Sequence, residues 1–237
     1  PARPAGGAPV AKIVDLDQVA DERAVFLRCY MMMTENMLTG IEQGEFKDPA
    51  WVERLLNRFA DYYFVALEAY DQDPTSAPAI WRIAHLATAD AQVVALQKLL
   101  YGVNAHINYD LVLTLVDLLE PEWATLSEAQ RLQRYTDHCA VNDVIGRTID
   151  AVQDQVLEIS TPSMDIIDKL FGPLDELLIS RLISEWREVV WESAIRLINC
   201  NDPDERQYII HAVEADALRK ADAIGFKDWR TTLRELW

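Results

Sequence analysis

The segment 99–113, LLYGVNAHINYDLVL, constrains the fold more strongly than any other part of the chain. Its apolar residues have the spacing of a buried helix, and polar side chains are set among them. His106 and Asp110 lie four residues apart, so on a helix they project from one face, with about 5–6 Å between their Cβ atoms. Asn104 and Asn108 form a second such pair. Because burying bare polar groups costs several kcal/mol, each needs a metal ion, a substrate or another side chain as a partner.

Helical spacing of apolar residues continues through most of the remaining sequence. It predicts helices over 15–43, 50–70 and 127–159, one from residue 79, a long one ending at residue 120, a short one over 163–171, and two more from residues 173 and 203. Asp48 before Pro49 and Asp202 before Pro203 are typical of helix starts. Period-two β-branched runs and Asn-Gly turns are missing from the sequence. We therefore expect an all-α, single-domain helical bundle of about seven or eight helices.

The beginning of the chain differs in composition from the rest. Pro, Ala and Gly dominate the first ten residues, without the basic and apolar regions of a signal peptide. We expect residues 1–14 to be a flexible lead-in and residues 15–237 to form the single all-α domain. No stretch reaches the roughly 18 uninterrupted apolar residues that a membrane-spanning helix needs, so no membrane span is expected.

The net charge indicates which kinds of partner to expect, and the cysteine content indicates the redox state of the compartment. The formal net charge of −17 disfavours binding to nucleic acid or to an anionic membrane surface, which leaves a small-molecule substrate as the expected partner. Cys29, Cys139 and Cys200 are odd in number and have no paired spacing, which argues against a disulfide framework or a zinc finger. Reduced thiols are typical of a cytoplasmic protein, the location expected here.

Two segments carry a resemblance to a known family. FADYYFVAL at residues 59–67 and GVNAHINYDL at residues 102–111, together with Trp81, resemble a family of uncharacterised, all-helical proteins known only as a domain of unknown function. The resemblance extends from Asp48 to Leu119. It implies the all-helical fold and carries no established activity.

A second, local resemblance concerns metal binding. Gly102, His106 and Asp110, each four residues apart, are similar to the helix motif of the zinc-dependent phospholipase C and P1 nuclease group. In that group the His and the Asp bind zinc, and an Asp and a His from upstream helices complete the site. Asp61 and His85 stand in the matching order here. The second His that follows this motif in the group is missing between residues 111 and 119.

That group also has a His followed four residues later by an acid, which serves another metal ion. In this chain His138 is followed by Asn142, with Asp143 next. A third pattern, NDVIGRTID at residues 142–150, resembles the second metal motif of class I terpene synthases. Its final acid is Asp rather than Glu, and the partner Asp-Asp-x-x-Asp motif is not found upstream.

The hypothesis that we favour from the sequence is a metal-dependent, hydrolase-like enzyme. An imidazole and a carboxylate on one helical face suit zinc, iron or manganese, and an open coordination position would turn a bound water into a nucleophile. The expected metal ligands are Asp61, His85, His106, Asp110, His138 and Asp143. The expected catalytic residues are His106, Asp110 and His138, and the expected substrate contacts are Asn104, Asn108 and Tyr109.

Two further hypotheses stay open at this point. In the first, aromatic residues wall a metal-free pocket for a small molecule, and His106 and Asp110 act as an acid/base pair of a lyase or cyclase type. In the second, the polar residues satisfy one another and fix the packing register of a non-catalytic bundle. Metal content and a cavity beside His106 distinguish the three hypotheses.

Overall fold

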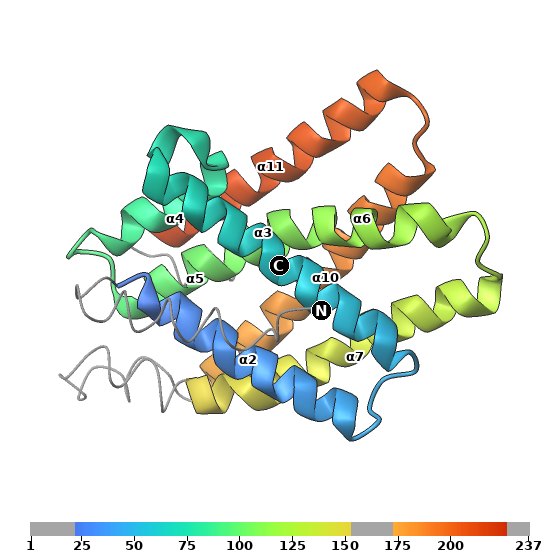
Figure 1. Cartoon of the computed structure of the whole chain (residues 1–237). Coiled ribbons are helices and arrows are strands. Elements are labelled where there is room, and N and C mark those ends of the chain that lie inside the picture. The colour runs from blue at the N-terminus through green and yellow to red at the C-terminus, as the bar shows by residue number, and fades with distance from the viewer. Residues whose placement is uncertain (1–21, 153–172, 227–237) are drawn as a thin grey trace. The chain divides into compact units, whose positions relative to one another are not determined.

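The computed structural model describes residues 22–152 and 173–226 (Figure 1). Helices are the regular elements in these two ranges, and no β-strand occurs within them. The all-α prediction is therefore confirmed. The predicted lead-in over residues 1–14 and the predicted short helix over 163–171 lie outside the described residues.

The chain is grouped into two compact units, and each is described by itself. Unit 1 comprises residues 1–56 and 128–184, and unit 2 comprises residues 57–127 and 185–237. Two of the three boundaries fall inside long helices, α3 (Pro49–Gln72) and α10 (Pro173–Asn199), and the third lies between residues 127 and 128. The single domain predicted over residues 15–237 remains a prediction.

Two long helices form the main packing of unit 1. Helix α2 (Ala24–Glu42) packs against α7 (Glu128–Val152), blue and yellow-green in Figure 1. Leu27, Met37 and Val144 are almost fully buried between the helices of this unit. The amide of Asn36 donates to Thr148 Oγ1 over 2.9 Å. Met37 thus fills core space, as methionine commonly does.

A buried carboxylate anchors the start of α3 in unit 1. Asp137 of α7 accepts the backbone N–H groups of Lys47 and Asp48 over 2.6 and 2.8 Å. The Asp48 side chain in turn accepts the Trp51 backbone N–H over 3.0 Å, which confirms its predicted capping position. Arg134 also contacts the Asp48 carboxylate, 2.5 Å away.

Unit 2 is organised around one continuous helical run. It consists of α5 (Ala95–Ala105), η2 (His106–Asp110) and α6 (Leu111–Trp123). The other elements of this unit are the second part of α3, η1 (Pro74–Ser76), α4 (Ala79–Thr88), the second part of α10 and α11 (Pro203–Gly225). Helices α4 and α11 pack against α5, and α11 also packs against η2.

Local signals explain two of these helix ends. Asp202 accepts the backbone N–H groups of Asp204 and Glu205, both over 2.9 Å, so the predicted cap of α11 is confirmed. Helix α6 continues to Trp123, three residues past the predicted end at residue 120. Pro121 is tolerated there because it lies in the last turn, where few backbone hydrogen bonds follow it. None of the helices within the described ranges is long and apolar enough to cross a membrane.

Candidate functional site

The central helix of unit 2 changes its winding where the sequence is most polar. Residues His106–Asp110 form a π-helix, which separates α5 from α6. His106, Asn108 and Asp110 are all buried, and Asp110 is only 1% exposed. Single π-helical turns inside α-helices are uncommon and often occur at functional sites. The segment singled out from the sequence is therefore also the least regular part of the helix.

A hydrogen-bonded trio lies on one side of this turn. His106 Nδ1 is 2.9 Å from Asp110 Oδ2, as the spacing of four residues predicts. The indole Nε1 of Trp81, on α4, donates to the same oxygen over 2.9 Å. Asp110 thus joins its own helix to α4, and two nitrogen atoms share one carboxylate oxygen.

Aromatic rings enclose the imidazole of His106. Phe59, on α3, is stacked on it with ring centroids 3.5 Å apart and an angle of 8° between the planes. Tyr63 and Trp81 lie at its edges, with centroids 6.0 and 6.1 Å away. Phe59 itself is half-buried, so the imidazole faces an apolar cage with one partly exposed wall.

Burial determines the protonation of the pair. The pKa of His106 is lowered because the site excludes water, although the hydrogen bond and the charge of Asp110 oppose this shift. The pKa of Asp110 is raised by the same burial, against the hydrogen bonds from His106 and Trp81. The imidazole is therefore neutral at neutral pH, and in the tautomer with hydrogen on Nδ1 this N–H donates a hydrogen bond to Asp110 Oδ2.

His85 lies next to one member of this trio, Trp81, whereas Asp61 lies on the exposed side of α3. His85, on α4, is buried beside Trp81 and Tyr70, with ring centroids 5.4 and 4.7 Å away. Asp61, on α3, has a side chain that is 64% exposed and lies 3.7 Å from Arg58. An exposed acid beside an arginine is the ordinary surface arrangement, so the geometry does not favour Asp61 as a ligand.

His138 and Asp143 lie in unit 1. His138 is buried and Asp143 is exposed, both on α7. Among the described residues, no three His, Cys, Asp or Glu side chains form a group that could hold a metal ion. The predicted metal site, and the roles of these two residues, thus gain no support from the geometry and remain predictions.

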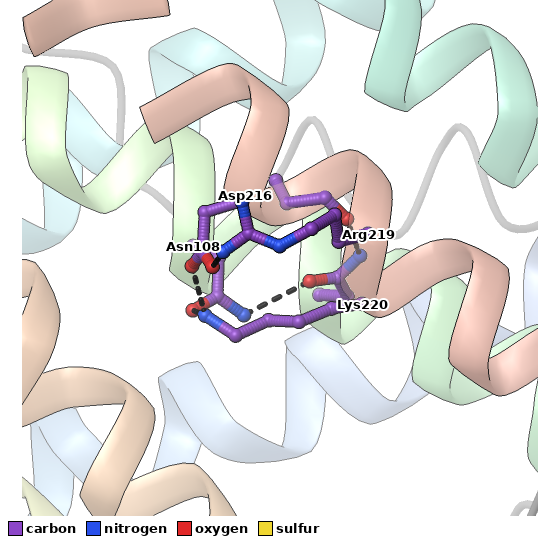
Figure 2. Close-up of polar contacts among 6 residues, drawn as sticks. Asn108, Asp216, Arg219 and Lys220 are labelled. Carbon is purple, nitrogen blue, oxygen red and sulfur yellow. Dashed lines mark hydrogen bonds and ion pairs between the residues drawn. The ribbon is translucent and has the colours of Figure 1, made fainter. Parts of the chain in front are cut away.

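Asn104 and Asn108 point toward a different helix. Asn104 Nδ2 donates to the backbone oxygen of Ala217 on α11 over 2.9 Å, and Asn108 Nδ2 donates to Asn104 Oδ1 over 2.9 Å. Asn108 Oδ1 accepts from Lys220 Nζ over 2.7 Å (Figure 2). The amides therefore bind α11, whereas the imidazole of His106 faces α3 and α4.

Tyr109, the third expected substrate contact, is half-buried. Its pKa is raised by burial and by the negative charges of Glu214 and Asp110. A protonated phenol at neutral pH is able to donate a hydrogen bond, so its expected role in substrate binding stays open to test.

Several residues at these two sites were not found from the sequence. Lys220 and Asp216 lie four residues apart on α11, a spacing that predicts an ion pair on a helix but does not indicate its partner helix. Phe59 and Trp81 carried the family resemblance, but nothing in the sequence indicated that they contact His106. Such contacts join residues far apart in the chain, and only the fold brings them together.

Comparisons with known proteins identify a family and add no activity. A family described as a family of unknown function, DUF5995, matches residues 11–225. No curated protein and no solved structure matches the chain. The resemblance to the phospholipase C and P1 nuclease group therefore finds no support. The match spans both compact units and extends well beyond residues 48–119, so the chain belongs to the family of unknown function DUF5995.

Proposed function

We propose that the protein acts on a small organic molecule at His106, with Asp110 as its partner in acid–base chemistry and without a metal ion. The observation that carries this proposal is the buried hydrogen bond of 2.9 Å between His106 Nδ1 and Asp110 Oδ2 in a π-helical turn. A carboxylate bonded to one ring nitrogen fixes the imidazole tautomer and leaves the other nitrogen, Nε2, as the base.

The environment of the pair supports this role. Since the pKa of His106 is lowered by burial, the imidazole is unprotonated at neutral pH, the form that a general base requires. Phe59 covers one face of the ring and is only half-buried. A rotation of this single side chain would open a route to the imidazole for an apolar or aromatic substrate.

Metal-assisted hydrolysis, favoured by the sequence, is less well supported. A histidine whose second nitrogen is bonded to a carboxylate is also typical of metal sites. Such sites need at least three protein ligands, however, and the described part of the chain contains no such group around His106. The described residues around His106 therefore favour chemistry without a metal ion, and we assign a metal no step.

The second candidate is a purely architectural role for the same trio. His106 and Asp110 have side chains only 4% and 2% exposed, and Trp81 donates a further hydrogen bond to Asp110. Buried polar networks of this kind can fix the register of packed helices. The two candidates differ in whether a small molecule can reach Nε2 while the protein is folded.

Diethyl pyrocarbonate, a small reagent that acylates unprotonated imidazole, tests this difference. The folded, full-length protein would be treated at neutral pH and modification would be measured at each histidine by peptide mass mapping. His211, exposed on α11, is the internal reference. We expect His106 to react within about tenfold of the His211 rate, which requires an opening equilibrium of no more than about 1.4 kcal/mol.

Two variants make the test specific. Asp110→Asn should slow modification of His106, because the amide no longer fixes the tautomer in which Nε2 is unprotonated. Asp61→Asn, an exposed site on α3 of the same unit, should leave the rate unchanged. If His106 reacts only as fast as the whole protein unfolds, the acid–base proposal is wrong and the architectural role is correct. Near-stoichiometric metal in the purified protein, lost in His106→Ala, would instead restore the metal hypothesis.

The three cysteines bear on where this chemistry would take place. Cys29, Cys139 and Cys200 are free thiols, and burial raises the pKa of Cys29 to about 12, which disfavours its reactive thiolate form. Free thiols are compatible with a reducing compartment. A cytoplasmic location accordingly remains part of the proposal, to be checked by localising the protein in its cell.

A further inference from the structure

A second polar cluster lies on the opposite side of the π-helical turn. Lys220, on α11, extends toward η2, where its Nζ is 2.7 Å from Asn108 Oδ1 and 2.5 Å from Asp216 Oδ2 (Figure 2). The same nitrogen lies 5.5 Å from the centre of the Trp186 ring. The Lys220 side chain is only 13% exposed.

From this geometry we propose that Lys220 is a nucleophilic amine that condenses with a small aldehyde or ketone to form an imine. The site is distinct from the His106 site, because its members face α11 rather than α3 and α4. The proposal does not depend on the function proposed above.

The neighbours of the amine are those that such a reaction needs. Asp216 is within proton-transfer distance, so its carboxylate can take the proton that makes the amine nucleophilic. Asn108 Oδ1 holds the amine in place, and its own amide is held by Asn104. The indole of Trp186 provides an apolar wall against which the carbon chain of a carbonyl compound can pack.

The surroundings of Lys220 also favour the neutral form of its amine. The pKa of Lys220 is lowered from its ordinary value by burial first of all, and the positive charge of Arg219 adds to this effect. Asp216, which also pairs with Arg219 over 2.5 Å, opposes the shift. A lysine that is desolvated and lies beside a second cation is a recognised form of activated amine.

The reaction balances without any further reagent. The Lys220 ammonium gives one proton to Asp216, and the freed electron pair forms a bond from Nζ to the carbonyl carbon. The carbonyl oxygen takes up protons, one from the nitrogen and one returned by Asp216, and leaves as water. The product is a protonated imine, so one ammonium and one carbonyl compound give one iminium ion and one water molecule.

Reductive trapping tests the proposal on the full chain. The protein would be incubated with propanal and sodium cyanoborohydride at pH 7, and alkylation would be followed at each of the six lysines by peptide mass mapping. Lys47, which is exposed, is the reference. We expect Lys220 to be alkylated faster than Lys47, because burial lowers the pKa of Lys220 and leaves more of the neutral amine at pH 7.

Internal controls show whether fast alkylation of Lys220 takes place in the folded protein. Lys98 is only 4% exposed and should remain unmodified while the protein is folded. Lys220→Arg, which keeps the charge, should abolish the fast alkylation, whereas Lys47→Arg should preserve it. If Lys220 reacts no faster than Lys47, or only together with Lys98, the proposal is overturned and the cluster is an ion pair that joins α11 to η2.

Discussion

Trp81 and Asp110 lie 29 residues apart in the chain and are joined by a hydrogen bond from the indole Nε1 to the carboxylate Oδ2, 2.9 Å long. Both residues are almost fully buried. The same carboxylate oxygen is 2.9 Å from His106 Nδ1, so the bond between helices and the bond within the helix depend on one atom. Removal of either donor therefore changes the environment of the other.

Trp81→Phe isolates the contribution of this bond to stability. The substitution removes the indole N–H but keeps an aromatic ring on α4. Asp110 then loses a donor in a buried site, and the loss of a hydrogen bond to a charged group costs about 1.5–3 kcal/mol. We expect the free energy of unfolding, measured by urea denaturation, to fall by this amount and by a smaller contribution from the reduced ring area.

Trp51→Phe is the matched control. Trp51 is fully buried on α3, and in the described ranges its Nε1 has no hydrogen-bond partner. Its ring contacts Arg134, whose guanidinium carbon lies 5.3 Å from the ring centre. This variant should therefore lose only ring area. If both variants lose the same stability, the Trp81–Asp110 bond contributes nothing measurable.

Asp137→Asn tests the anchor at the start of α3. The carboxylate accepts two backbone N–H groups, from Lys47 and Asp48, and an amide has only one oxygen to replace it. One N–H then faces an NH₂ group inside the protein, which costs about 1–3 kcal/mol. Thermal and urea unfolding should both report this loss.

Asp143→Asn provides the comparison on the same helix. Asp143 is exposed on α7, so the substitution should change the free energy of unfolding by no more than about 0.5 kcal/mol. An equal loss of stability in Asp137→Asn and Asp143→Asn would show that Asp137 does not anchor the start of α3. Metal bound by the wild type and lost in Asp143→Asn would instead support the metal role predicted from the sequence.

The sequence predicted the local features of this protein better than its contacts over long distances. Helical periodicity gave the all-α class, and Asp202 before Pro203 gave the cap of α11, because both depend on neighbouring residues. The pairing of His106 with Asp110 followed from a spacing of four residues. The π-helical turn between them could not be predicted, since a π-helix and an α-helix place such neighbours on similar faces.

Contacts between helices account for most of what was missed. Trp81, Phe59 and Lys220 approach the central helix only because α4, α3 and α11 pack around it. Asp61 stands in the order that the metal-binding motif requires, but its side chain lies on the exposed side of α3 beside Arg58. A set of possible ligands in the right order is therefore weak evidence until the fold brings their side chains together.

Gly225→Ala and Gly146→Ala should have opposite effects on stability. A Cβ at Gly225 would lie 2.7 Å from Tyr101 Oη, closer than atoms tolerate, so the ring must move. Among the described residues, a Cβ at Gly146 would meet only Ser180 Oγ, at an ordinary 3.5 Å, and alanine favours a helix interior by about 1 kcal/mol over glycine. We expect Gly146→Ala to raise the melting temperature and Gly225→Ala to lower it.

Tyr101→Phe tests whether contact with Tyr101 Oη causes the loss of stability in Gly225→Ala. Combined with Gly225→Ala, it removes the oxygen that the new methyl group meets, so the double variant should recover most of the stability lost by Gly225→Ala. If the double variant is no more stable than Gly225→Ala alone, the loss has another origin than contact with Tyr101.

The pH dependence of stability tests the buried state of His106. In the unfolded chain a histidine takes up a proton below about pH 6.5, whereas the folded imidazole has a lowered pKa and stays neutral. The unfolded state then binds more protons, so the free energy of unfolding should fall as the pH drops below about 6.5, by at most about 1.4 kcal/mol per unit. The raised pKa of Asp110 acts in the opposite direction, because the folded carboxylate takes up its proton first. The free energy of unfolding should therefore be measured by urea denaturation from pH 7.5 to 5 for the wild type and for His106→Gln. The difference between the two pH dependences is the contribution of His106. If the free energies of the two proteins change in parallel with pH, His106 is not held neutral.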